Sequence, residues 1–140
     1  MKRHATANWK GSGKEGTGSL TTKTGILNST PFSYHTRFVA EEQQAVTNPE
    51  ELIAAAHAGC FSMKLSFVIG NAGFVPDEIT TVATVTLEGG AITHIHLDLK
   101  ACVPGMSQEQ FLTAAEDAKA NCPVSKALSA VEISMSAELL

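Results

Sequence analysis

Three cysteines are the residues best suited to covalent chemistry in this chain of 140 residues. They are Cys60, Cys102 and Cys122, and no two of them form a Cys-X-X-Cys motif. An odd number of cysteines does not make a framework of structural disulfides, so we expect free thiols in a reducing cytoplasm. A disulfide formed there would be transient and catalytic. The question is which thiols are reactive and which are inert.

Cys122 lies in the sequence Asn121-Cys122-Pro123, which places the proline at the first position of a short helix and Cys122 at its N-cap. A thiol at a helix N-terminus faces unpaired backbone N–H groups, which lower its pKa. The same position also fits a cysteine that merely fills the cap, and the two interpretations are equally good. Cys102 has no activating neighbour in the sequence, so we expect it to be inert.

Cys60 is predicted to lie in the middle of a long helix, with His57 on the same helix face three residues before it. By position alone, Cys60 fits a buried structural cysteine better than a nucleophile, because free cysteines are among the most buried residues. A thiol in mid-helix gains little from the helix dipole and needs a cation from elsewhere to ionise. His57 could act as a base or as half of a metal site, but a buried core histidine is the preferred interpretation.

Other polar residues have simple structural explanations. His94 and His96 share one face of a predicted strand, as metal ligands often do, but Asp98 lies on that face too and indicates an ordinary polar surface. We therefore expect no metal and no cofactor. Taken alone, Arg37 is an exposed strand residue, and Glu50 complements the positive end of the helix that it begins.

The longest element is a predicted helix from Pro49 to about Ile69, with Asn48 as N-cap and Glu51 completing a capping box. Its surface is apolar or small nearly all round, which predicts burial on most sides and a partner subunit. The order of elements predicts an α+β fold with antiparallel sheet in a single domain over residues 1–140. The other predicted elements are strands at Ala5–Trp9, Ser19–Thr24, Phe32–Ala40, Thr80–Leu87, Ile92–Val103 and Val131–Leu139, a helix from Ser107 to about Ala120, and a short helix after Cys122-Pro123.

Composition excludes several classes of function. The formal charge of -4 and the scattered basic residues argue against a nucleic-acid partner. The polar N-terminal segment contains no apolar core of a secretory signal. The apolar stretch Leu52–Ile69 carries His57 and Lys64 and is rich in small residues, so it is predicted to be a buried helix of a soluble protein and not a membrane span.

Together, these segments resemble the osmotically inducible protein C (OsmC) family, whose sister group is the organic hydroperoxide resistance proteins. The N-terminal segment is more similar to the OsmC branch than to its sister. The resemblance covers nearly the whole chain in the right order. Its matching stretches are Gly25–Asn28, Thr36–Phe38, Thr47–Met63, Val103–Gly105 and Asn121–Leu128.

The resemblance implies an OsmC-like fold, with antiparallel sheets packed around a long central helix in an intertwined homodimer. It also implies a thiol peroxidase of oxidative and osmotic stress defence that prefers organic hydroperoxides to hydrogen peroxide and is reset by an external thiol or dithiol. Cys60 matches the family's peroxidatic cysteine and Cys122 its resolving cysteine. Arg37 matches the arginine that stabilises the thiolate, and Glu50 the carboxylate that holds this arginine.

Ten residues separate Glu50 from Cys60, which is about 15 Å along a straight helix. Either Arg37 spans this distance or the site combines two subunits, and we expect the second. An apolar pocket lined by groups such as Phe61, Met63 and Phe111 would agree with the preference for organic hydroperoxides. One alternative is a non-enzymatic redox sensor or stress-binding protein on the same fold. Another is a metal-binding protein that uses His57, Cys60 and the His94–His96 pair.

Overall fold

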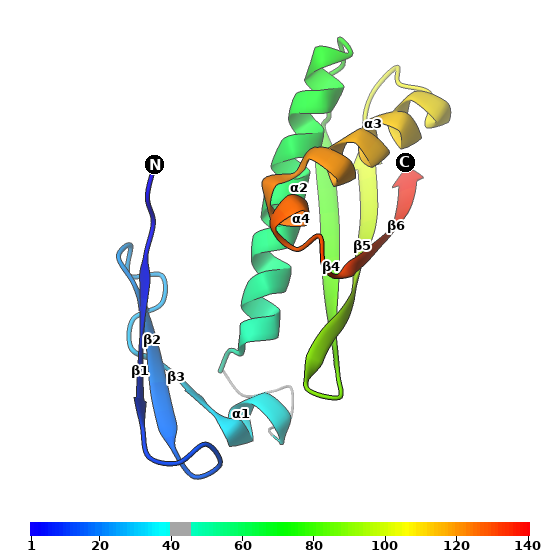
Figure 1. Ribbon diagram of the computed structural model, residues 1–140. Helices are drawn as coiled ribbons and strands as arrows, with labels where there is room; N and C mark the ends of the chain where they lie inside the picture. The colour runs from blue at the N-terminus through cyan, green and yellow to red at the C-terminus, as the bar shows by residue number, and fades with distance from the viewer. Residues whose placement is uncertain (40–45) are drawn as a thin grey trace. The chain divides into compact units, whose positions relative to one another are not determined.

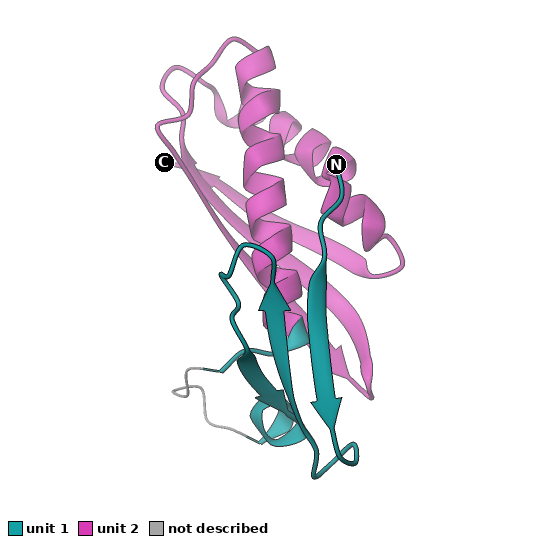
Figure 2. Ribbon diagram, turned by 90° about the vertical axis from the view of Figure 1, so that its left-hand side faces the viewer, with its two compact units in different colours: residues 1–49 teal, residues 50–140 magenta. Residues whose placement is uncertain are grey.

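The computed structural model describes residues 1–39 and 46–140, which form two compact units. Residues 1–49 make up the first unit and residues 50–140 the second (Figure 2). The prediction of a single domain over residues 1–140 stays a prediction.

The first unit contains a three-stranded antiparallel sheet of β1 (Ala5–Lys10), β2 (Thr17–Thr22) and β3 (Thr30–Ser33), in that order. Gly18 lies between Trp9 and Phe32 in the strand register, and these two rings contact each other at a centroid distance of 5.3 Å. A Cβ atom at Gly18 would lie 2.6 Å from the Phe32 ring and 2.7 Å from the Trp9 ring. Glycine at this position therefore lets the two rings meet across the central strand.

A short helix, α1 (Tyr34–Phe38), follows β3, so the predicted strand over Phe32–Ala40 is wrong from Tyr34 onward. Ala40, the last residue of that predicted strand, lies outside the described residues. The helix begins with a capping box in which Ser33 and Thr36 bond reciprocally to each other's backbone N–H groups. The rings of Tyr34 and Phe38 then meet one turn apart, at a centroid distance of 4.8 Å. Arg37 accordingly lies on a helix and not on a strand.

The second unit contains the sheet β4–β5–β6, in that order (Figure 1). Strands β4 (Glu78–Glu88) and β5 (Ala91–Cys102) form the predicted antiparallel hairpin, whose turn residues Gly89 and Gly90 have φ angles of 58° and 83°. Strand β6 (Glu132–Leu139) pairs with β5 in parallel, and this differs from the antiparallel pairing expected throughout. The reason is that α3 (Gln108–Asn121) and α4 (Pro123–Ala127) lie between β5 and β6 in the sequence. They return the chain to the end of the sheet where β5 begins, so β6 runs in the same direction as β5.

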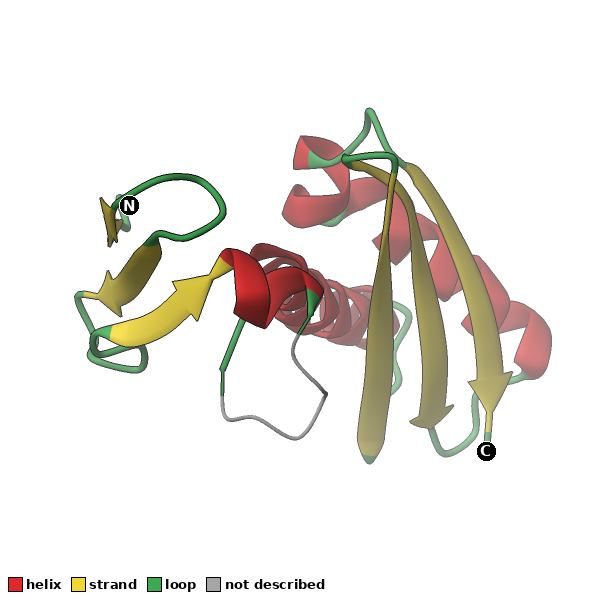
Figure 3. Cartoon of the chain, turned by 90° about the horizontal axis from the view of Figure 1, so that it is seen from below, coloured by secondary structure: helices red, strands yellow, loops and turns green. Residues whose placement is uncertain are grey.

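Helix α2 (Pro49–Asn71) and helix α3 (Gln108–Asn121) pack on one face of this sheet (Figure 3). The core joins Phe61 and Leu65 of α2, Leu97 and Leu99 of β5, and Phe111 of α3. Ser107 is the N-cap of helix α3, as predicted, and forms a capping box with Gln110. The layers therefore confirm the α+β fold class.

Within this chain, α2 buries one stripe only, in contrast to the burial on most sides expected for it. The stripe consists of His57, Phe61, Leu65 and Ile69. Two large apolar residues of the same helix, Met63 and Phe67, are each 64% exposed. Among the described residues, α2 is the helix long and apolar enough to cross a bilayer, but core helices meet the same criterion.

Candidate functional site

Two of the three thiols meet between α2 and the short helix α4 (Pro123–Ala127). Cys60 lies in mid-helix on α2 and is partly buried, whereas Cys122 is fully buried. Cys122 ends α3 and is also the N-cap of α4, as predicted, because Pro123 fixes the backbone at the first helical position. Cys60 packs against the buried cluster that contains Cys122, and each thiol shifts the pKa of the other, so the two side chains are neighbours. A disulfide between Cys60 and Cys122 would therefore join two side chains that are already neighbours in the fold.

The surroundings of the two thiols shift their pKa values in opposite directions. Burial is the main cause that raises the pKa of Cys60. The Val124 N–H opposes it, and the neighbouring Cys122 adds to the rise. Burial also acts to raise the pKa of Cys122, but hydrogen bonds outweigh it and the net shift is downward. These hydrogen bonds come from the Ser125 N–H, the Cys60 thiol, the Ser125 hydroxyl and the Val124 N–H, although none closes the cap with regular geometry. Of this pair, Cys122 is the more acidic thiol.

A second polar contact lies one helical turn from the thiols. His57 Nε2 and Ser125 Oγ are 2.8 Å apart, and both residues are buried. Burial lowers the pKa of His57 and so favours the neutral ring. The preferred interpretation of His57 as a core histidine is confirmed. Ser125 was not anticipated, although its position three residues after Cys122 places both side chains on one helix face.

A small open pocket of about 180 Å³ reaches Cys60. Its lining residues are Cys60, Met63, Lys64, Phe67 and Pro123. Of the three apolar residues suggested by the sequence, Met63 lines this pocket, but Phe61 and Phe111 belong to the buried core. Phe67 and Pro123 supply apolar surface in their place. The signal that separates Phe67 from Phe61 is the spacing along α2. Buried residues recur every four positions, at His57, Phe61, Leu65 and Ile69, and Phe67 lies off this stripe.

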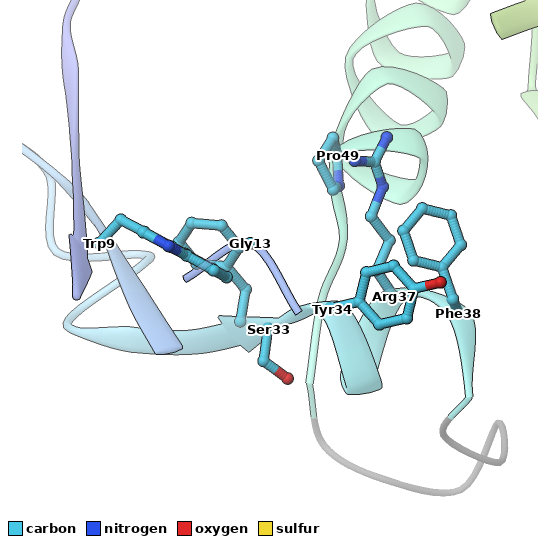
Figure 4. A pocket seen from close by; sticks show the side chains of 8 residues that line it. Trp9, Gly13, Ser33, Tyr34, Arg37, Phe38 and Pro49 are labelled. Atoms are coloured by element: carbon cyan, nitrogen blue, oxygen red, sulfur yellow. The ribbon is translucent and has the colours of Figure 1, made fainter. Parts of the chain in front are cut away.

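Arg37 lies in a pocket of about 150 Å³ in the first unit, together with the rings of Trp9, Tyr34 and Phe38 (Figure 4). Its guanidinium carbon lies 5.0 Å from the centroid of the Phe38 ring, within cation–π range. Glu50 is in the first turn of α2. Arg37 belongs to the first unit, whereas Glu50 and Cys60 belong to the second, so the predicted constellation of the three stays a prediction.

The remaining candidates have structural partners. His94 Nε2 and His96 Nδ1 lie 2.8 and 2.7 Å from Ser134 Oγ on the outer face of the sheet. Cys102 lies near the Asp77 carboxylate, with 4.0 Å between Sγ and Oδ2. Within residues 1–39 and 46–140, no three histidine, cysteine or acidic side chains cluster as metal ligands do.

Comparison with protein families gives a match to the model described as OsmC-like protein, over residues 42–136. Peroxiredoxin OsmC of Escherichia coli is 47% identical to this chain over 137 residues, which cover 95% of this chain and 93% of that protein. Peroxiredoxin OsmC of Shigella flexneri gives the same values.

Solved structures give the same result for the fold. An OsmC-like protein of unknown function from Vibrio cholerae superposes with a TM-score of 0.75 at 19% identity, over 98% of this chain and 99% of that one. The organic hydroperoxide resistance protein OhrB of Bacillus subtilis superposes with a TM-score of 0.64 at 24% identity, over 98% of both chains.

Proposed function

The chain belongs to the OsmC family, and on that premise we propose that it is a thiol-dependent peroxidase that reduces organic hydroperoxides with Cys60 and Cys122. The observation that carries the proposal is the contact between these two thiols, one at an open apolar pocket and the other at a helix N-terminus. The names of the relatives, peroxiredoxin and organic hydroperoxide resistance protein, support the same activity.

The proposed reaction has three steps. The Cys60 thiolate attacks one peroxide oxygen, the O–O bond breaks, and the alkoxide leaves and takes up a proton to give the alcohol and Cys60 sulfenic acid. The Cys122 thiolate then attacks the Cys60 sulfur, so that an S–S bond forms and hydroxide leaves as water after protonation. Two external thiol groups reduce this disulfide by exchange and restore both cysteines. A dithiol could supply both groups.

The first step requires a Cys60 thiolate, whose formation the second unit opposes by burial and by the neighbouring Cys122. Lys64 lines the pocket of Cys60, but it is not among the groups that shift the pKa of this thiol. We assign the missing cation to Arg37, held by Glu50, in a site that combines two subunits. A guanidinium at Cys60 would stabilise both the thiolate and the departing alkoxide.

A homodimer explains the exposed side chains on α2. Met63 and Phe67 lie at the pocket of Cys60 and are too large and apolar to be left in water without cost. A second copy that covers them would enclose the pocket and favour hydroperoxides with an apolar substituent over hydrogen peroxide. The proposal places the protein in the cytoplasm, where reductants return both cysteines to thiols.

The test is the turnover of cumene hydroperoxide and hydrogen peroxide with dithiothreitol. We expect catalytic consumption that is faster with the organic peroxide and is abolished in Cys60→Ser. Cys102→Ser is the matched control, because it removes the third thiol, which lies away from the pair, and should leave turnover unchanged. Oxidation limited to one equivalent per chain would favour the redox sensor, and activity that survives Cys60→Ser would refute the proposal.

A further inference from the structure

Between α2 and α4 there are two contacts in parallel, one polar and one made by the thiols. His57 and Cys60 are three residues apart on α2, and Ser125 and Cys122 are three residues apart at the start of α4. Residues at this spacing lie on one helix face, so the hydrogen bond between His57 and Ser125 runs beside the Cys60–Cys122 contact. The polar contact thus fixes the first turn of α4, and Cys122 with it, against α2.

The direction of the hydrogen bonds follows from the unpartnered atom of His57. Nδ1 is buried and has no hydrogen-bond partner within residues 1–39 and 46–140, whereas Nε2 bonds to Ser125. A buried N–H group without an acceptor is rarer than a buried acceptor without a donor. Nδ1 is therefore assigned as the unprotonated nitrogen, and the ring proton lies on Nε2. His57 then donates to Ser125 Oγ. The single hydroxyl proton of Ser125 is therefore free for another acceptor, and the Cys122 sulfur, whose pKa Ser125 lowers, is the acceptor that we assign to it.

From this geometry we infer that His57 and Ser125 accelerate the resolving step of the proposed reaction. Their hydrogen bond positions Cys122 against Cys60 and turns the Ser125 hydroxyl onto the resolving sulfur. Ser125 contacts a reacting atom, whereas His57 is a positioning residue that acts through Ser125. The inference rests on the proposed function, since it concerns the formation of the Cys60–Cys122 disulfide.

The step that this pair serves is the attack of the Cys122 thiolate on Cys60 sulfenic acid. The Cys122 sulfur supplies the electron pair and is oxidised, the Cys60 S–O bond breaks, and hydroxide leaves and takes a proton from solvent. A hydroxyl donor at Cys122 favours its thiolate and so raises the fraction of chains that can resolve at a given pH. In the described part of the chain, the titratable groups that act on Cys122 are Cys60 and, through Ser125, His57, both on α2.

The experiment follows disulfide formation after one equivalent of cumene hydroperoxide, with dimedone as a trap for the unresolved sulfenic acid and mass spectrometry as the readout. In Ser125→Ala we expect disulfide formation about tenfold slower, equivalent to about 1.4 kcal/mol, and more dimedone on Cys60. We also expect the acid limb of the rate profile to move to higher pH. Ser125→Thr, which keeps a hydroxyl, should restore both.

A double variant separates this role from a purely structural one. Ser125→Ala leaves a buried His57 unpaired, whereas His57→Leu with Ser125→Ala removes both partners and keeps the helices packed. The double variant should therefore fold well and still resolve slowly. Ser134→Ala is the matched control, because it removes a hydroxyl that lies at the same 2.8 Å distance from a histidine, His94, away from the thiols.

The outcomes distinguish this inference from the proposed function. If the wild type forms the disulfide and the double variant forms it at the same rate with the same pH profile, His57 and Ser125 are structural only. If the wild type itself forms no Cys60–Cys122 disulfide, the proposed function fails and the inference fails with it.

Discussion

Phe67→Ala tests whether a second copy of the chain covers α2. In the single chain 64% of Phe67 is exposed, so truncation should cost little in a monomer. Full burial of a phenylalanine side chain contributes about 1.5–3 kcal/mol. Covering the exposed two thirds would therefore contribute roughly 1–2 kcal/mol per chain. A two-fold interface contains the residue twice, and the dimer loses roughly 2–4 kcal/mol.

This loss corresponds to a rise in the dimer Kd of about 30- to 1,000-fold. Sedimentation equilibrium over a range of protein concentrations measures it directly. Val82→Ala on β4 is the control, because Val82 is 56% exposed on a different element and should leave the Kd unchanged. An unchanged Kd in Phe67→Ala, or a wild type that is monomeric at every concentration, would refute the reasoning.

Three further predictions concern stability, measured by urea denaturation. Leu65→Ala opens a cavity at a fully buried position and should cost about 2–5 kcal/mol, and a loss no larger than that of its neighbour Lys64→Ala would contradict the packing. Ser107→Ala removes the capping box of α3 and should cost about 1 kcal/mol, so an unchanged midpoint would count against it. Burial lowers the pKa of His57 from 6.5, so as the pH falls His57 binds a proton in the unfolded chain before it does so in the folded chain. The free energy of unfolding should therefore fall as the pH drops below 6.5. This part of the pH dependence should vanish in His57→Gln and persist in His96→Gln.

Features set by neighbouring residues could be predicted from the sequence. The capping box at Ser107, the Gly89-Gly90 turn and the proline after Cys122 each depend on a few consecutive residues, and all three were found where expected. The segment Tyr34–Phe38 was predicted wrongly because Tyr34 and Phe38, which share a face in a strand, are also four residues apart and so share a face in a helix. The reciprocal bonds of Ser33 and Thr36 decide in favour of the helix.

Features that join distant segments could not be predicted from the residues alone. The hydrogen bond between His57 and Ser125 spans 68 residues, and no local pattern pairs them. The family resemblance assigned Cys60 and Cys122 to one site, but the opposite shifts of their pKa values depend on burial and on the N–H groups at the start of α4. Neither the burial of the thiols nor their contacts with these N–H groups can be predicted from the spacing of the cysteines.

The parallel pairing of β6 with β5 has a consequence for the order of folding. The β4–β5 hairpin closes over a two-residue turn and can form within microseconds. The pairing of β5 with β6, which places His94 opposite Glu132, can form only after α3 and α4 have formed between the two strands. During that interval, one edge of β5 is open to the strands of other chains. A substitution that slows α3, such as Ser107→Ala, should therefore increase aggregation during refolding more than its cost to the native state suggests.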